Sequence, residues 1–227
     1  MTDARPTLIP PTPDAEDYKA SDGGGAEDMF SHEDPLALFS AWLAEAGETE
    51  VNDPNAVALA TVDAHGLPDV RMVLLKGLVD LGGEYGFVVY SHSGSAKGVQ
   101  MAANPRAAMC FHWKSLRRQV RLRGEVRRIE GARADAYFAE RARLSQIGAW
   151  ASQQSRELES REVLRERIAA YDARFGDDVP RPEGWIGYAL VPDAIEFWAD
   201  RPYRLHDRLQ FVRDGQSGGW TRHRLYP

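Results

Sequence analysis

A short segment near the C-terminus places cationic and proton-transferring side chains close to aromatic ones. The motif IEFW at 195–198 is followed by RLHDR at 204–208. Side chains alternate between faces in an extended strand, which would bring Arg204, His206 and Arg208 to one side. Burying three such groups without an anionic or hydrogen-bonding partner is unfavourable, so the pattern indicates a site for a negatively charged ligand. The alternative is a solvated edge strand with no ligand.

A second candidate anion site is the loop SGSAKG at 93–98. A glycine-containing loop that leads into a helix presents free backbone N–H groups, and Ser95 and Lys97 add a hydroxyl and an ammonium. A phosphate could therefore bind there, although the glycine spacing matches neither the Walker nor the dinucleotide fingerprint. The alternative is an ordinary serine-capped helix with a solvent-facing lysine.

Three polar side chains, Tyr137, Arg141 and Ser145, are spaced four residues apart. If the helix expected from residue 132 extends that far, they share one face and form a phosphate clamp. The alternative is an amphipathic helix with Tyr137 in the core and Arg141 in solvent.

The strand expected at 71–76 (RMVLLK) has a cation at each end. Because 71 and 76 differ by an odd number, Arg71 and Lys76 face opposite sides and could serve separate ligand groups. The alternative is that both are ordinary surface residues with no role in ligand binding.

The basic run between Lys114 and Arg128 raises the question of nucleic-acid binding. Val120, Leu122 and Val126 alternate there with polar residues, which is typical of a strand with one wet face, and we favour that interpretation. Gln119 shares the polar face.

Histidines are scattered, with no metal-binding spacing and no nucleophile motif, so the pattern predicts no metal site and favours chemistry carried by a bound cofactor.

Charge and composition predict a cytoplasmic protein with one main domain. The first 50 residues carry 12 acidic and 2 basic side chains, and the remaining 22 acids and 26 bases give residues 51–227 a balance of +4. A mildly cationic body suits small phosphorylated ligands. Cys110 is the only cysteine, which excludes an intrachain disulfide and fits a reducing compartment. No apolar stretch approaches the ~18 residues needed to span a bilayer.

The order of expected elements predicts a mostly β fold with flanking helices. Residues 1–30 have the composition of a flexible acidic leader, and residues 31–227 form the domain. A helix capped by Asp34 begins at Pro35. Strands are expected at 57–62, 70–75, 85–90, 107–113, 119–129, 187–191, 194–198, 208–213 and 220–225, and further helices at 132–143 and 156–175.

From about residue 35 to its end, the chain resembles the pyridoxamine 5'-phosphate oxidase family. The collinear motifs that carry the resemblance are RMVLLK at 71–76, YSHSGSAKG at 90–98, RRQVRLRGEV at 117–126, SQIGAWASQQS at 145–155, VPRPEGWIGY at 179–188, IEFW at 195–198, RLHDR at 204–208 and RLYP at 224–227.

The resemblance implies an FMN-binding split β-barrel that forms a homodimer with FMN in the clefts between subunits. It implies FMN contacts from Arg71, Met72, Val73, Leu74, Leu75, Lys76, Tyr90, Ser91, Lys97, Gln119, Gln154, Ser155, Trp198 and Arg208. The substrate phosphate would be held by Lys76, Tyr137, Arg141 and Ser145, with Arg204 and His206 as the catalytic residues over the pyridine ring.

The implied reaction is the FMN-dependent oxidation of pyridoxamine or pyridoxine 5'-phosphate by oxygen, which yields pyridoxal 5'-phosphate and hydrogen peroxide.

Two positions depart from the family pattern: Ala96 stands where the family usually has Arg, and Ala15, upstream of Tyr18, occupies the arginine position of an N-terminal lid. Two alternatives stay open, a noncatalytic protein that binds FMN or pyridoxal phosphate on the same fold, and a flavin reductase. The RLHDR segment and the clamp spacing argue against the reductase.

Overall fold

The computed structural model describes Glu16, residues 29–215 and residues 218–227. Nearly all of the expected leader, with Ala15 and Tyr18, lies outside the described residues. Among the described residues, no helix combines the length and the apolar character needed to cross a membrane.

The strands of the described chain form one nine-stranded antiparallel sheet. Its path runs β2-β1-β5-β6-β7-β4-β3, with β8 paired to β7 and β9 to β8. The expected mostly β architecture is confirmed, and β3 was not expected. The strands are β1 (Ala56–Val62), β2 (Pro68–Leu74), β3 (Gly77–Asp80), β4 (Tyr85–His92), β5 (Arg106–Trp113), β6 (Arg118–Ile129), β7 (Trp185–Ala199), β8 (Asp207–Arg213) and β9 (Trp220–Arg224).

The two strands expected at 187–191 and 194–198 are one strand, β7. Its first half pairs with β4 and its second half with β8, while β6 follows it along almost its whole length. The register shifts between Arg123 and Gly124, opposite Pro192. Proline has no N–H to donate, so the ladder is irregular where Pro192 falls, but the strand continues.

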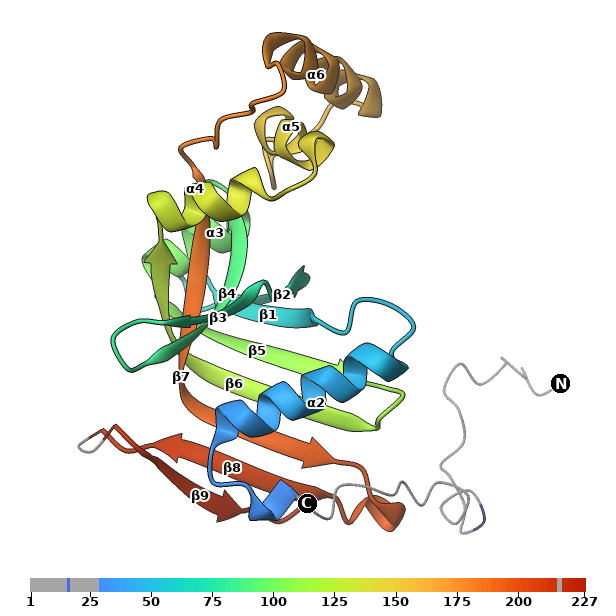
Figure 1. Ribbon diagram of the computed structural model, residues 1–227, viewed down its shortest axis with the longest axis vertical. Helices are drawn as coiled ribbons and strands as arrows, with labels where there is room; N and C mark the ends of the chain where they lie inside the picture. Colours follow the sequence, from blue (N-terminus) through green and yellow to red (C-terminus); the bar gives the residue numbers. More distant parts are fainter. Residues whose placement is uncertain (1–15, 17–28, 216–217) are drawn as a thin grey trace, which may run out of the picture.

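Helices flank the sheet on one face and at one end (Figure 1). The expected helix at 132–143 is two helices, because the backbone leaves the helical path after residue 139, and the helix expected from residue 156 begins five residues later. The helical elements are η1 (Met29–Ser31), α2 (Pro35–Thr49), α3 (Ala96–Ala103), α4 (Ala132–Ala139), α5 (Arg143–Ala151), α6 (Arg161–Arg174) and η2 (Pro202–Arg204).

Helix α2 lies across β5 and β6 and closes the main core (Figure 1). The carboxylate of Asp34 accepts a hydrogen bond of 2.9 Å from the backbone of Leu36, as the sequence predicted for the cap. Phe39 is almost fully buried and contacts the rings of Phe87 and Phe111 at centroid distances of 4.9 and 5.1 Å. The apolar stripe of the helix therefore covers one face of the sheet.

A smaller core joins α4 and α5 to the start of β7. Phe138, Ile147 and Trp185 are buried in it, and the ring of Phe138 packs edge-on against Trp185 at 5.0 Å. In Figure 1, α4, α5 and α6 gather at one end of the molecule and β8 and β9 at the other, with β7 running between them. This core fixes the helical end of the protein to the sheet.

The bulge at Gly124 predicts a strong stability effect. A Cβ atom at this position would lie 1.9 Å from the carbonyl oxygen of Val191, a backbone atom that cannot rotate away. We expect Gly124→Ala to lower the free energy of unfolding by about 3 kcal/mol or more, as severe overpacking does. Gly47→Ala is the matched control, because nothing lies within 4 Å of that Cβ position in α2, and it should stabilise by about 0.5–1 kcal/mol. Urea denaturation measures both, and equal midpoints would contradict this account.

Candidate functional site

A cavity of about 370 Å³ lies where β2, β4, α3, α4 and the start of β7 meet. It brings together most of the side chains that the family resemblance implies as FMN contacts. It also includes Tyr137 and Arg141, two of the three polar residues spaced along 137–145. Its lining comprises Arg71, Met72, Val73, Leu74, Lys76, Tyr90, Ser91, Lys97, Tyr137, Arg141, Gln154 and Trp185.

Lys97 carries a buried positive charge in this cavity. Its Nζ donates to Ser91 Oγ at 2.9 Å and to Gln154 Oε1 at 3.1 Å, both neutral acceptors. Burial lowers the pKa of Lys97, and the nearby charge of Arg71 lowers it further. Among the described residues no carboxylate pairs with this ammonium. The solvent-facing lysine of the alternative interpretation is therefore wrong, and the position suits an anion.

Ser95 caps α3. Its hydroxyl donates to the carbonyl of His92 at 2.7 Å and accepts from the backbone of Gly98 at 3.3 Å. Gly98 allows the helix to start this close to the preceding loop, because a Cβ there would lie 2.5 Å from the carbonyl oxygen of Ser93. The loop at 93–98 thus contributes Lys97 to the cavity, while the Ser95 hydroxyl is occupied by the cap.

Arg141 carries a second partly buried charge. Its guanidinium lies 4.9 Å from the ring centroid of Trp185 and 5.7 Å from that of Phe138. Burial lowers the pKa of Arg141, and its NH1 atom is buried without a hydrogen-bond partner in the described structure. A buried guanidinium nitrogen that lacks an acceptor is rare and unfavourable, so this atom marks a place for an anionic oxygen.

Aromatic rings form the wall beside Arg141. The ring of Tyr90 lies nearly parallel to those of Tyr137 and Trp185, at centroid distances of 4.2 and 5.0 Å, and the latter two rings are 6.1 Å apart. Burial raises the pKa of Tyr90, which keeps its phenol protonated and able to donate. Trp185 was not expected in the site, although it opens a strand directly after the Pro-Glu-Gly turn. The wall gives the cavity flat apolar surfaces next to its cations.

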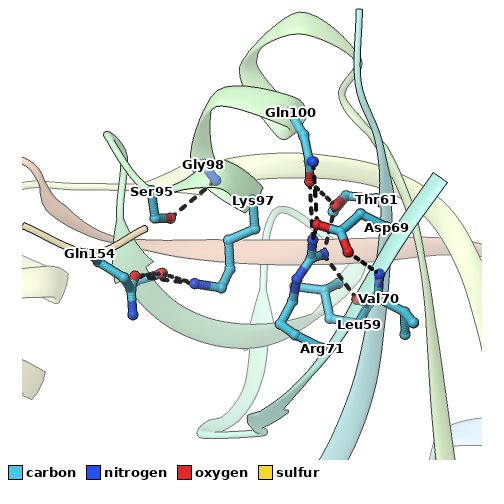
Figure 2. Close-up of polar contacts among 11 residues, drawn as sticks. Leu59, Thr61, Asp69, Val70, Arg71, Ser95, Lys97, Gly98, Gln100 and Gln154 are labelled. Atoms are coloured by element: carbon cyan, nitrogen blue, oxygen red, sulfur yellow. Dashed lines mark hydrogen bonds and ion pairs between the residues drawn. The ribbon is translucent and has the colours of Figure 1, made fainter. Parts of the chain in front are cut away.

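Arg71 is the third cation of the cavity and is fully oriented by the protein (Figure 2). Its two terminal nitrogens donate to Leu59 O, Thr61 Oγ1, Asp69 Oδ2 and Gln100 Oε1. None of these four acceptors was expected at the site. Gln100 alone had a sequence signal, because it lies three residues after Lys97 on a predicted helix and so shares its face.

Three predicted contact residues lie apart from this cavity. Leu75 is buried in the main core, Ser145 is exposed at the start of α5, and Ser155 borders a neighbouring hollow of about 310 Å³. The idea that 137, 141 and 145 share one helix face is wrong, because α4 ends at Ala139. Tyr137 and Arg141 meet through the turn that follows α4.

The remaining predicted residues gather at the other end of β7. Gln119 pairs with Trp198, and Trp198 pairs with Arg208 across three adjacent strands. His206 packs on Trp198 at 4.6 Å. Trp185 and Trp198 are 13 residue steps apart along β7, which at about 3.3 Å per residue is roughly 40 Å of strand. One chain therefore presents the predicted site in two separate parts.

The expectation that Arg204, His206 and Arg208 alternate along a strand is wrong. Pro202 starts the short helical turn η2, and Tyr203 and Arg204 have positive φ values of 57° and 61°. Strand β8 begins only at Asp207. Proline pre-sets a turn rather than a central strand, and the exposed Arg204 projects from that turn.

Carboxylates hold in place the predicted site residues at the C-terminal end of β7. The buried Glu196 accepts from Arg208 at 2.9 Å and from Arg121 at 2.5 Å, and Arg208 also donates to the carbonyl of Tyr226 at 2.8 Å. Asp200 lies 3.0 Å from His206 Nδ1. Across the described part of the chain, no cluster of three His, Cys, Asp or Glu residues could hold a metal ion.

Comparisons with known proteins agree on one family. Residues 43–175 match the family model described as pyridoxamine 5'-phosphate oxidase, and residues 185–227 match that of the pyridoxine 5'-phosphate oxidase C-terminal dimerisation region. The chain is 57% identical over 221 residues to the pyridoxine/pyridoxamine 5'-phosphate oxidase of Maricaulis maris, covering 97% of this chain and 98% of that one. Identity to the same enzyme of Caulobacter vibrioides is 54% over 226 residues, with 99% of each chain covered.

Solved structures show the same fold. PhzG from Burkholderia lata, in complex with tetrahydrophenazine-1-carboxylic acid, has a TM-score of 0.79 and 33% identity, covering 86% of this chain and 94% of that chain. An FMN-binding, oxidase-related protein from Nostoc punctiforme has a TM-score of 0.68 at 18% identity, with 86% of this chain and 98% of that one covered. The expected split-barrel fold is thereby confirmed, and the chain belongs to the pyridoxamine 5'-phosphate oxidase family.

Proposed function

We propose that this protein oxidises pyridoxamine 5'-phosphate and pyridoxine 5'-phosphate to pyridoxal 5'-phosphate, with FMN as cofactor, oxygen as electron acceptor and hydrogen peroxide as product. The observation that carries the proposal is the pair of cations, Lys97 and Arg141, which are buried or half-buried in one cavity and have no carboxylate partner in the described part of the chain. Two separate anionic groups, one from the cofactor and one from the substrate, would satisfy them.

The residues around Lys97 fit an FMN phosphate. Arg71 and Lys97 are close enough for the charge of Arg71 to lower the pKa of Lys97, so an anion between them relieves their repulsion. Gln154 and Ser91 add polar groups beside the ammonium. When bound, FMN supplies the redox chemistry, namely acceptance of a hydride equivalent from C4' of the substrate and its transfer to oxygen.

The residues around Arg141 fit the substrate phosphate. Arg141, Tyr137 and Lys76 line the same cavity, and the orphaned NH1 atom needs an anionic oxygen. Ser145 belongs to the proposed clamp but is exposed, so its contact requires the phosphate to reach the start of α5. The task of this group is to bind and orient the substrate against the cofactor.

A homodimer would complete the site. The dimerisation-region match covers Trp198, His206 and Arg208, which lie roughly 40 Å along β7 from the cavity. On the outer face of the sheet, a hollow of about 400 Å³ is lined by small apolar residues of β1 and β5 together with Arg208. Val70 and Met72 beside it are 62% and 64% exposed. A second copy on this face would bring its segment 204–208 to the cavity, where Arg204 and His206 would lie over the pyridine ring.

Reconstitution tests the proposal directly. Protein supplied with FMN should be yellow, and addition of pyridoxamine 5'-phosphate should produce peroxide and an aldehyde absorbance. Unphosphorylated pyridoxamine is the control, because it lacks the group that Arg141 would bind and should be used poorly. Binding of FMN without turnover would instead support the noncatalytic alternative, and failure to bind FMN would refute both.

Substitutions should separate binding from turnover. Arg141→Ala removes a charge-assisted contact of about 1.5–3 kcal/mol and should raise the KM for pyridoxamine 5'-phosphate on the order of 10- to 100-fold. Arg204→Ala should mainly lower kcat, by roughly 10- to 100-fold. Arg165→Ala, at an exposed position of α6, is the control and should change neither parameter. Equal changes in both parameters from both site variants would contradict this division.

Mixed dimers test whether two subunits share each site. The Arg141→Ala and Arg204→Ala proteins are mixed in equal amounts, unfolded and refolded together. The rate is then measured at a pyridoxamine 5'-phosphate concentration well below the wild-type KM, where each substitution alone lowers activity. If a site combines Arg141 of one subunit with Arg204 of the other, each mixed dimer regains one intact site, and activity should recover to about a quarter of wild type. If one subunit supplies both residues, no recovery occurs.

A further inference from the structure

We infer that Thr61 and Gln100 are positioning residues that aim Arg71 at the phosphate of the cofactor. The inference rests on the proposed binding of FMN in this cavity. It concerns two uncharged side chains that do not line the cavity but contact Arg71 directly.

Arg71 uses four of its five N–H donors within the protein (Figure 2). NH1 donates to Leu59 O at 3.0 Å and to Thr61 Oγ1 at 2.6 Å. NH2 donates to Asp69 Oδ2 at 2.6 Å and to Gln100 Oε1 at 3.1 Å. Only the Nε–H is left without a partner in the described structure, so the plane of the guanidinium is set before any ligand arrives.

Thr61 and Gln100 also hold each other. The Thr61 hydroxyl, in a residue that is only 1% exposed, donates to Gln100 Oε1 at 2.5 Å while it accepts from Arg71. Gln100 Nε2 points to Asp69 Oδ2 at 3.4 Å. The amide therefore has one orientation, because the reverse would turn its NH2 group toward the donors of Thr61 and Arg71.

This arrangement couples two strands to one helix. Thr61 lies on β1, Arg71 on β2 and Gln100 on α3, three residues after Lys97. One turn of α3 thus carries Lys97 and also fixes Arg71. The distance between Arg71 and Lys97 is set by this network, which matches the need to grip a single phosphate from two sides.

The neutral partners have a different effect from Asp69. Asp69 is a half-exposed carboxylate, and the hydrogen bond from Gln100, followed by the charge of Arg71, holds its pKa below the usual value. Water screens such a pair. Thr61 and Gln100 orient the guanidinium without cancelling its charge, so the charge stays available to the phosphate.

Binding of two flavins to the apoprotein tests the inference. Thr61→Val and Gln100→Met remove hydrogen bonds at nearly constant volume. Each should raise the Kd for FMN by about three- to tenfold, the effect of leaving one long side chain to be ordered on binding. The Kd for riboflavin, which has no phosphate, should not change. Thr61→Ser keeps the hydroxyl and should bind FMN like wild type, and Val99→Ala, 54% exposed on α3, is the control outside the network.

The outcomes separate this inference from the proposed function. Equal affinity of wild type and both variants for FMN, or parallel losses for FMN and riboflavin, would overturn the positioning role. Wild-type protein that binds neither flavin would refute the proposed function itself. Thermal unfolding of each apoprotein shows whether the fold is kept, and if Thr61→Val fails to fold, Gln100→Met alone decides.

Discussion

The constraint on which the site depends is positive charge in a cavity where Lys97 and Arg141 have no carboxylate partner among the described residues. A partly buried ammonium or guanidinium loses hydration, and in this protein Lys97 has only neutral acceptors, while one nitrogen of Arg141 has none. The lowered pKa of each group has burial as its main cause. A bound anion would restore the missing interactions, so part of the stability of the liganded protein would come from the ligand.

Strand β7 determines how the parts of the site are distributed. It begins at the aromatic wall of the cavity and ends beside Arg208, and past the bulge opposite Gly124 its partner on the edge away from β6 changes from β4 to β8. Because β7 is long, Trp185 and Trp198 lie near its opposite ends, although only 13 residue steps separate them in the sequence. The C-terminal region that matches a dimerisation model contains the predicted ligand contacts Trp198 and Arg208.

Polar residues behind the cations decide the geometry of the site. Glu196 holds Arg208, and Thr61 and Gln100 hold Arg71. An arginine that is already ordered loses less freedom when a ligand binds, and this favours binding without any added contact. Such partners come from different strands and helices, which is why the sheet and α3 must form before the site exists.

The sequence alone was enough for the class of fold, the positions of most strands, the cap of α2 and the family, because these follow from local periodicity, turn residues and collinear motifs. It also indicated Lys97 and Arg141 as anion contacts. It could not show that β7 is continuous, that Pro202 turns the chain before Asp207, or that α4 ends at Ala139, since each depends on pairing and packing with distant segments. The hydrogen bonds around Arg71 and the division of the site between the two ends of β7 were decided only by the tertiary structure, because a bond between residues on different strands, such as Arg71 and Thr61, leaves no local pattern.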